Sequence, residues 1–289
     1  MKILITGATG LIGTEVTKKL AAAGHKVTAT DRNLGEIPHN VKFIQGDLND
    51  DAFIQSLKFN FDALIHLAVS VNRYDDLGFK TFNENVDWSY KLFAKAAAGG
   101  TKIVVYGSSM AIYGIPYSKF WVSPKFVPFD ESLPLNQYEG YSLSKEVIER
   151  TADMWSNRSN TEFVGLRLPF CNTERVITGH ATQLMNGDLI LGRILAKCFW
   201  GYLDIRDAAG GILTLLDKKS NSKGSTTYNF AAPDTIAPYP TKEMLANFFP
   251  RTKVIREIPG YGALSDCSRW LDTYGYHPMF LLDRTKVGV

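Results

Sequence analysis

The stretch "KILITGATGLIG", residues 2–13, decides the fold. Its first part, KILIT (2–6), is a short β-branched apolar run, the pattern of a strand buried on both faces of a parallel sheet. Glycines then recur at every third position, and the run LIGTEVTKKLAAAG (11–24) shows helical spacing before it ends in glycine. Strand, glycine-rich turn and helix in this order predict the first half of a βαβ unit.

The same alternation continues outward from this stretch. Further strand-like apolar runs lie at residues 26–31, 41–47, 62–68, 101–109 and 162–168. Helical segments lie between most of them, at roughly 50–58, 83–98 and 139–157. Strands that alternate with helices predict an α/β fold with a parallel sheet whose two faces are covered by helices.

Composition and charge limit the classes of protein to which the chain can belong. The 289 residues are 45% apolar and 21% charged, values typical of a globular domain. The net charge of +3 and the lack of a basic run argue against nucleic acid or an anionic membrane as a partner. We see neither a signal-peptide pattern nor an apolar run of bilayer length, so we expect a soluble cytoplasmic protein.

Cysteine usage agrees with that expectation. The three cysteines, Cys171, Cys198 and Cys267, are an odd number and are widely spaced. They lack the paired spacing of a metal site, so we expect reduced thiols and no bound metal.

Three glycines of the opening stretch, Gly7, Gly10 and Gly13, indicate a dinucleotide site. Glycine permits the tight turn, the close approach of backbone to a pyrophosphate, and the close packing of helix on strand. The helix N-terminus then offers unpaired amides to the phosphates. The second strand ends at Asp31, 18 residues after Gly13, where a carboxylate can bind both ribose hydroxyls of an adenosine.

The residues beside this carboxylate bear on the choice of cofactor. Asp31 would repel the 2′-phosphate of NADP, which favours NAD, but Arg32 could accommodate that phosphate, so NADP stays open. The GDLND stretch after the third strand places Asp47 and Leu48 to flank an adenine. Asp50, in the same stretch, is as consistent with a helix cap as with a ligand contact.

From residue 2 to about 275 the chain resembles the extended short-chain dehydrogenases/reductases, often called the NAD-dependent epimerase/dehydratase family. The resemblance rests on motifs in the family's order. They are GATGLIG, Asp31, GDL, IHLA (65–68), NENV with Asn85, GSSMAIYG (107–114), Tyr141 with Lys145, GYLDIRDAA (201–209) and YNFAAP (228–233).

This resemblance implies a Rossmann-type doubly wound parallel sheet with a small C-terminal substrate lobe. Because the pattern of strands and helices loosens beyond residue 170, we expect a dinucleotide-binding domain over 1–170 and a substrate-binding lobe over 171–289, partly interleaved. A homodimer formed through two long helices is common in the family. Its cofactor contacts add a further set of residues, Leu11, Ile12, Leu67, Ala68 and Pro169.

Tyr141 and Lys145 lie four residues apart in YEGYSLSKEVIER (138–150), and so share one face of a helix. The resemblance places this face toward the nicotinamide, where Tyr141 would exchange the substrate's hydroxyl proton during hydride transfer. A neighbouring ammonium favours the phenolate that this role requires, and Lys145 would also hold the nicotinamide ribose. Ser109 would hydrogen-bond the substrate oxygen, although Ser108 could take that role instead.

The resemblance also narrows the reaction. Sugar 4,6-dehydratases of the family carry an acid pair after the serine or threonine, whereas this chain has Met110 and Ala111, which makes dehydration unfavoured. The 4-epimerases usually carry an asparagine three residues after the arginine of the sixth strand. Here that position is Phe170, with Asn172 displaced by two. They often carry a diphosphate-binding arginine where this chain has Trp200, so a smaller or less charged substrate is favoured.

Uronate and aldose dehydrogenases of the family share the Val-Ser pair after the fourth strand. Their substrate contacts make Ser70 and Arg175 candidates here, beside Ser109, Tyr141, Phe170 and Asn172. The aromatic-rich segment 117–131 could form a wall over the substrate or could be core. We interpret His66 as a packed residue rather than a catalyst, and Arg206 and Asp207 as residues that cap and orient a helix.

The leading hypothesis is therefore an NAD(P)-dependent oxidoreductase that acts on a secondary hydroxyl of a sugar or sugar acid. One alternative is a nucleotide-sugar (UDP-hexose) 4-epimerase, which uses the same Ser-Tyr-Lys set. A second alternative is a dinucleotide-sensing binding protein. Sensors of this family typically lack the tyrosine or the lysine, and this chain keeps both.

Overall fold

A central sheet of seven strands organises the chain in the computed structural model, which describes residues 1–71, 78–218 and 223–288. The strand order is β10-β7-β5-β4-β1-β2-β3. The strands are β1 Lys2–Thr6, β2 Lys26–Asp31, β3 Lys42–Gln45, β4 Ala63–His66, β5 Ile103–Ser109, β7 Glu162–Leu168 and β10 Ser225–Asn229. The order reverses at β1, which pairs in parallel with both β2 and β4, so the predicted doubly wound sheet is confirmed.

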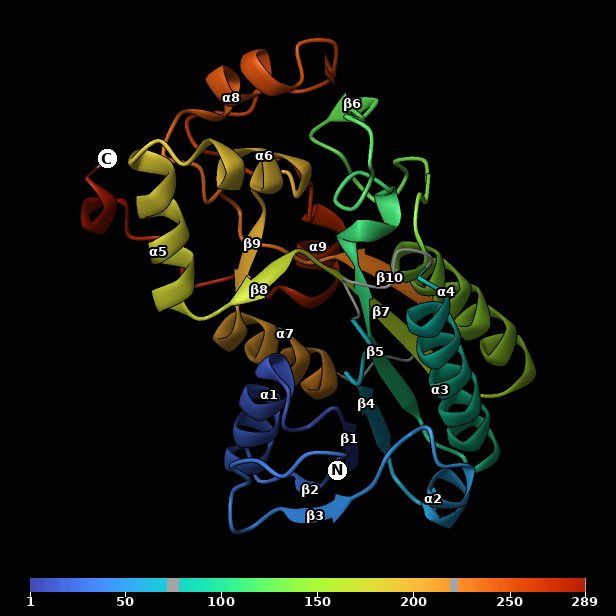
Figure 1. Cartoon of the computed structure of the whole chain (residues 1–289). Coiled ribbons are helices and arrows are strands. Elements are labelled where there is room, and N and C mark those ends of the chain that lie inside the picture. Colours follow the sequence, from blue (N-terminus) through green and yellow to red (C-terminus); the bar gives the residue numbers. More distant parts are fainter. Residues whose placement is uncertain (72–77, 219–222, 289) are drawn as a thin grey trace. The chain divides into compact units, whose positions relative to one another are not determined.

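Four helices accompany this sheet in the first part of the chain: α1 Leu11–Ala22, α2 Asp51–Ser56, α3 Phe79–Ala98 and α4 Gly140–Arg158. Helices α3 and α4 lie side by side on one face of the sheet, and α1 lies on the other (Figure 1). Helix α3 begins four residues before the predicted start at 83, because Gly78 takes a left-handed conformation (φ 62°) that turns the chain into the helix.

The seventh strand, β10, was missed by the sequence analysis, which predicted only a loose lobe in that part of the chain. Its sequence STTYN has no continuous apolar run, and its first three residues are only half-buried. A strand at the edge of a sheet pairs on one side only, so it does not need the run of apolar residues that marked the central strands.

The chain forms two compact units, each built from several segments. Unit 1 contains residues 1–108, 139–166 and 212–227, and unit 2 contains 109–138, 167–211 and 228–289. Unit 1 has a core around Leu64, Phe93 and Val104. Chain segments thus alternate between the units, and the assignment of substrate binding to residues 171–289 stays a prediction.

Unit 2 contains short elements around an aromatic core that includes Phe129, Phe199 and Trp200. Strands β8 and β9 pair in parallel, and β6 pairs with β11. The elements not yet given are η1 Met110–Tyr113, β6 Phe126–Val127, β8 Phe170–Asn172, α5 Glu174–Met185, α6 Leu189–Lys197, β9 Tyr202–Asp204, α7 Ile205–Asp217, α8 Thr241–Phe248, β11 Lys253–Val254, α9 Ser268–Tyr274 and η2 Arg284–Val287. Helix α7 and strands β5, β7 and β10 have residues in both units.

The start of α7 differs in detail from the sequence interpretation. Asp204, and not Asp207, caps the helix, because its Oδ1 accepts the Arg206 amide at 2.8 Å. The fully buried Asp207 instead accepts hydrogen bonds from the Tyr276 hydroxyl and the Met279 amide, at 2.9 and 2.8 Å. Its carboxylate thereby holds the C-terminal segment, a role that requires contacts about 70 residues away along the chain.

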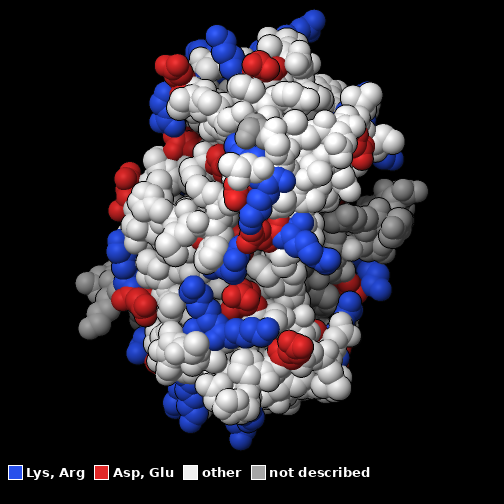
Figure 2. Space-filling model, turned by 90° about the vertical axis from the view of Figure 1, so that its left-hand side faces the viewer, with Lys and Arg blue, Asp and Glu red and all other residues white. Residues whose placement is uncertain are grey.

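The surface shows charges of both signs. On the face in Figure 2, lysine and arginine side chains are interspersed with aspartate and glutamate, a mixture that produces no extended field of one sign. Among the described residues, no helix combines the length and apolar character needed to cross a bilayer. Nor do those residues gather three or more potential metal ligands in one place.

Candidate functional site

Two glycines that follow β1, Gly7 and Gly13, lie too close to neighbouring backbone to carry a side chain. Gly7 has φ +70°, and a Cβ there would lie 2.5 Å from the Ala68 amide nitrogen. A Cβ on Gly13 would overlap the Gly7 carbonyl oxygen. Gly10 is the N-cap of α1, and the first turn of this helix has no acidic residue. The loop therefore presents bare backbone and a helix N-terminus, a cradle that fits a pyrophosphate.

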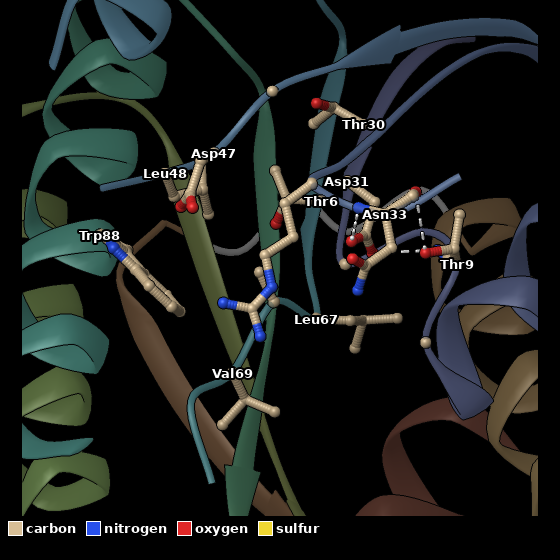
Figure 3. Close-up of a pocket in the computed structure, with 15 residues that line it drawn as sticks. Thr6, Thr9, Thr30, Asp31, Asn33, Asp47, Leu48, Leu67, Val69 and Trp88 are labelled. Carbon is tan, nitrogen blue, oxygen red and sulfur yellow. Dashed lines mark hydrogen bonds between the residues drawn. The ribbon is translucent and has the colours of Figure 1, made fainter. Parts of the chain in front are cut away.

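A pocket of about 220 Å³ opens beside this loop, at the carboxyl ends of β1, β2 and β4 (Figure 3). Eight of the predicted cofactor residues line it: Gly7, Gly10, Asp31, Arg32, Asp47, Leu48, Leu67 and Ala68. The lining also includes seven residues that the sequence analysis missed, Thr6, Thr9, Thr30, Asn33, Gly46, Val69 and Trp88. Thr6 and Thr30 could have been found from their places near strand ends, whereas Trp88, in a helix, carries no such signal.

The other predicted cofactor residues do not line this pocket. Leu11, Ile12 and Gly13 are in the first turn of α1, just past the loop. Tyr141 and Lys145 are in α4, and Pro169 belongs to unit 2. Their contacts with a cofactor stay predictions.

Asp31 is held in place at the end of β2 by two backbone amides. Its Oδ2 accepts from the Thr9 amide and its Oδ1 from the Asn33 amide, both at 3.1 Å. Figure 3 shows the three residues together on one side of the pocket. Arg32 is exposed, and its carbonyl oxygen accepts from Gln45 at 2.9 Å. A carboxylate fixed at this strand end is positioned to bind ribose hydroxyls.

The acidic turn after β3 divides its residues between two roles. Asp47 and the buried Leu48 line the pocket, and the Asp47 carboxylate accepts the Asn49 amide at 2.9 Å. Asp50 instead caps α2, since its Oδ1 accepts the Ala52 amide at 2.9 Å. Of the two readings left open for Asp50, the helix cap is the one that its contacts support.

Helix α4 positions the tyrosine and the lysine. It begins with Glu139 as N-cap, whose carboxylate accepts the Tyr141 and Ser142 amides at 2.6 and 2.7 Å. Lys145 is 4% exposed and donates from Nζ to the Gly107 carbonyl at 2.7 Å. This nitrogen lies 5.5 Å from the centroid of the Tyr141 ring. Burial lowers the pKa of Lys145 to about 8, against an opposing influence of the Glu149 carboxylate.

The two serines at the end of β5 have different partners. Ser108 is buried, and its hydroxyl donates to Glu149 at 2.6 Å. Ser109 is the last residue of β5, and its Oγ accepts the Ala111 amide at 3.1 Å, which leaves its hydroxyl proton for another acceptor. Met110 and Ala111 are both buried and apolar, at 3% exposure. Ser109 is therefore the better candidate to bind a substrate oxygen.

A hydrogen-bonded network in unit 1 includes Asn85 and His66. The amide of Asn85 bonds both main-chain groups of Ser70, accepting at 2.7 Å and donating at 3.0 Å. It also donates to Ser144 in α4 at 3.3 Å. His66 is paired with Thr6 and Ser89 at 2.7 and 3.0 Å.

Burial, followed by the charge of Lys145, lowers the pKa of His66 to about 3, so the imidazole is neutral at pH 7. These contacts agree with a packing role for His66. They also identify Asn85, noted in the sequence only as part of a motif, as the residue that positions Ser70.

The predicted substrate residues of unit 2 have varied surroundings. Phe170 stacks on His180 with ring centroids 5.1 Å apart, and Asn172 accepts the adjacent Thr173 amide at 3.0 Å. Arg175 is exposed on the first turn of α5. Trp200 is fully buried, 5.4 Å from the Phe248 ring. The substrate contacts predicted for Phe170, Asn172, Arg175 and Ser70 stay predictions.

The aromatic segment 117–131 contributes to the packing of unit 2. Phe129 is fully buried, 4.6 Å from the Phe199 ring. Trp121 donates from Nε1 to the Phe248 carbonyl at 2.9 Å and stacks on Phe249 at 5.5 Å. These two aromatic residues therefore pack against other parts of the same unit.

Comparison with known proteins supplies a family and a set of similar folds. The profile of the NAD dependent epimerase/dehydratase family matches residues 3–231. A UDP-glucose 4-epimerase of Neisseria meningitidis (serogroup A, serotype 4A) is 29% identical over 164 residues, which are 51% of this chain and 46% of that protein. The chain thus spans about half the length of the curated relatives it matches.

Two solved structures illustrate the similarity of fold. A short-chain dehydrogenase/reductase superfamily protein from Agrobacterium tumefaciens, with bound NAD, superposes with a TM-score of 0.74 at 20% identity. The superposition covers 100% of this chain and 95% of the Agrobacterium chain. A mutated uronate dehydrogenase superposes with a TM-score of 0.63 at 20% identity. This superposition covers 96% of this chain and 81% of the dehydrogenase chain.

Proposed function

The chain belongs to the NAD-dependent epimerase/dehydratase family, and within that family we propose that it is an oxidoreductase acting on a secondary hydroxyl of a sugar or sugar acid. The observation that carries the proposal is the environment of Lys145. The residue is buried, at 4% exposure, and its ammonium group is bonded to the Gly107 carbonyl and lies 5.5 Å from the centroid of the Tyr141 ring. A buried ammonium destabilises a fold, so its presence beside a phenol in a nucleotide-binding unit points to chemistry.

The cofactor of this family is NAD, and the unit 1 pocket offers the groups to hold it. The glycine loop and the α1 amides would bind the pyrophosphate, Asp31 the adenosine ribose, and the Asp47–Leu48 turn the adenine. When bound, NAD supplies the hydride acceptor. The carboxylate of Asp31 disfavours a 2′-phosphate at the same place, which supports NAD over NADP.

Three side chains of this chain would manage the substrate's proton and oxygen. Tyr141, as phenolate, takes the proton of the hydroxyl while hydride leaves the same carbon, so that the alcohol becomes a carbonyl. Lys145, charged below pH 8, stabilises the phenolate. Ser109 donates a hydrogen bond to the substrate oxygen and thereby stabilises the negative charge that develops there.

The neighbours of Ser109 disfavour a dehydratase. Elimination of water requires an acid to protonate the leaving hydroxyl and a base to remove a proton. Met110 and Ala111, which follow Ser109 directly, are buried apolar residues that do neither. Net oxidation or reduction fits these residues better than dehydration.

We favour a dehydrogenase over an epimerase because of Trp200. Family 4-epimerases often carry an arginine for the substrate diphosphate at the corresponding position. Here the position holds an indole that is fully buried and packs edge-on against the rings of Phe248 and Phe249. An apolar residue in this place supports a substrate without a nucleoside diphosphate.

A UDP-hexose 4-epimerase is the second candidate. It is favoured by the Neisseria relative, which is named UDP-glucose 4-epimerase. The same Ser109, Tyr141 and Lys145 would serve it, with hydride returned to the opposite face of the carbonyl.

A substrate panel tests both candidates. Purified protein would be incubated with NAD and with sugars, sugar acids or UDP-hexoses, while absorbance at 340 nm reports net reduction and chromatography reports epimerised product. Net NADH with a sugar or sugar acid supports the dehydrogenase, and UDP-hexose conversion without net NADH supports the epimerase. Tyr141→Phe is expected to lower either rate by about a thousandfold. Tyr138→Phe, a change at an exposed neighbour, is the matched control.

The proposal fails if no member of the panel turns over, or if Tyr141→Phe turns over as fast as Tyr138→Phe. The first outcome removes the substrate class, and the second removes Tyr141 from the chemistry. Binding of NAD without any turnover would favour the dinucleotide sensor.

We also propose that the protein is a homodimer built through α3 and α4. Three exposed apolar side chains on these helices support this, Phe79, Tyr90 and Leu143. Light scattering at micromolar protein is expected to give twice the monomer mass, and a monomer in Tyr90→Lys. A monomeric mass for the wild type would contradict the proposal.

A further inference from the structure

Among the residues that the structure describes, Trp88 is the one aromatic side chain that lines the unit 1 pocket. It belongs to α3 and is 5% exposed. Figure 3 shows its indole reaching toward the pocket from the α3 side, across from Thr9 and Asn33. Since the residue also lines the pocket, its small exposed area is a surface that a bound molecule would contact.

A hydrogen bond sets the orientation of this indole. Its Nε1 donates to the Asn49 side-chain oxygen at 3.1 Å, so the polar edge of the ring is satisfied by the protein. Most of the carbon surface of the ring packs in the core of unit 1, and the part that lines the pocket is available for an apolar contact. Asn49 follows Leu48 in the acidic turn, and the bond therefore ties the indole to the same turn that carries Leu48.

The positions of the other lining residues decide which part of NAD would face Trp88. The pyrophosphate belongs at the glycine loop and the adenosine ribose at Asp31. Among the described residues, Trp88 donates its hydrogen bond to Asn49 in the turn after β3, and not to the glycine loop or to Asp31. In Figure 3 the indole lies on the same side of the pocket as Asp47 and Leu48. That side is the adenine end.

We propose that Trp88 forms the wall of the adenine subsite and packs its ring against the adenine of NAD. The inference rests on the proposed use of the cofactor and adds a contact residue to it. A nucleobase is flat and apolar on its faces, and an indole matches it in both respects. Leu48 supplies a second apolar surface in the same pocket.

Tryptophan fluorescence tests the contact without catalysis. The chain has five tryptophans, so a change at Trp88 is separated from the others by substitution. Titration of the wild type with NAD is expected to quench tryptophan emission, and titration with NADH to show energy transfer to the nicotinamide. Trp88→Phe is expected to lose most of both signals. Trp155→Phe, at a position on α4 outside the pocket, is expected to keep them.

Calorimetry adds the affinity. Trp88→Ala is expected to raise the Kd for NAD about tenfold or more, and Trp88→Phe about threefold, because phenylalanine keeps an aromatic face. ADP-ribose, which has the adenosine half of NAD and no nicotinamide, is expected to lose affinity by the same factors. Thermal unfolding of each variant would show that it is folded.

The inference is overturned if folded Trp88→Ala binds NAD and ADP-ribose as the wild type does, or if NAD quenches Trp88→Phe as strongly as the wild type. Either result leaves the proposed function standing when the wild type still binds and turns over NAD. A wild type that binds neither NAD nor ADP-ribose would overturn the cofactor use and, with it, this contact.

Discussion

Replacing Lys145 by methionine should change how the stability of the protein depends on pH. In the folded chain burial lowers the pKa of Lys145 from 10.5 to about 8. Between these values the unfolded chain holds a proton that the folded chain has released, so the free energy of unfolding rises with pH across this window. Methionine has a similar length and no proton, and the variant lacks this contribution.

The magnitude follows from the two pKa values. The difference between the folded and unfolded pKa of Lys145 corresponds to a total change of about 3.4 kcal/mol in the free energy of unfolding. About 2.5 kcal/mol of this change falls between pH 7 and pH 10. Between pH 7 and pH 10 the free energy of unfolding of the wild type is therefore expected to rise by about 2.5 kcal/mol relative to that of Lys145→Met. The lost bond to the Gly107 carbonyl lowers the stability of the variant by a constant amount and leaves the slope unchanged.

Urea unfolding at pH 7, 8, 9 and 10, followed by circular dichroism, measures the difference. Lys42→Met, a change at an exposed lysine of β3, is the control and should track the wild type. If the difference in free energy of unfolding between the wild type and Lys145→Met stays constant from pH 7 to pH 10, the reasoning is refuted. It would mean that Lys145 titrates as a solvated lysine, and the basis for its role beside Tyr141 would be lost.

Changes at three residues probe the cofactor site and its supports, and a change at a fourth residue is a control. Gly13→Ala is expected to abolish measurable NAD binding in calorimetry and to lower the free energy of unfolding by about 1–3 kcal/mol, since the methyl group of the alanine would overlap the Gly7 carbonyl oxygen. Gly179→Ala, in open space on α5, should instead stabilise by about 0.5–1 kcal/mol. Asp31→Ser should shift the ratio of NAD to NADP affinity toward NADP by about thirtyfold, as it removes a charge facing the 2′-phosphate; an unchanged ratio would contradict that role. Asn85→Asp should lower the free energy of unfolding by about 2 kcal/mol in urea, because a donor to the Ser70 carbonyl becomes an acceptor, and an unaltered midpoint would argue against the bond.

Much of the fold was readable from local patterns. The strands 26–31 and 162–168 were predicted to the residue, because the first contains the β-branched residues Val27, Thr28 and Thr30 and the second is mostly apolar. The edge strand β10 was missed because its sequence, STTYN, has no apolar run. The start of α3 was placed late because a left-handed glycine, and not a side-chain cap, precedes that helix.

The cofactor pocket was predicted in part for a related reason. The glycine loop, Asp31 and the Asp47–Leu48 turn follow strands directly, and the carboxyl ends of parallel strands meet at one edge of a sheet. Trp88 comes from the middle of a helix. Its place in the pocket depends on how α3 packs, which no spacing in the sequence reports.

By itself the sequence determined the first βαβ unit and the pairing of Tyr141 with Lys145 on one helix face, because each is encoded in one short stretch. It determined the family through motifs that are spread in order over most of the chain. Only the tertiary structure decided which serine has a free hydroxyl proton, which aspartate caps a helix, and which tryptophan lines the pocket. Ser108 is engaged by Glu149, 41 residues further along the chain. Partners at such separations are brought together by the packing of whole elements, and packing is a property of the folded chain rather than of any short stretch of it.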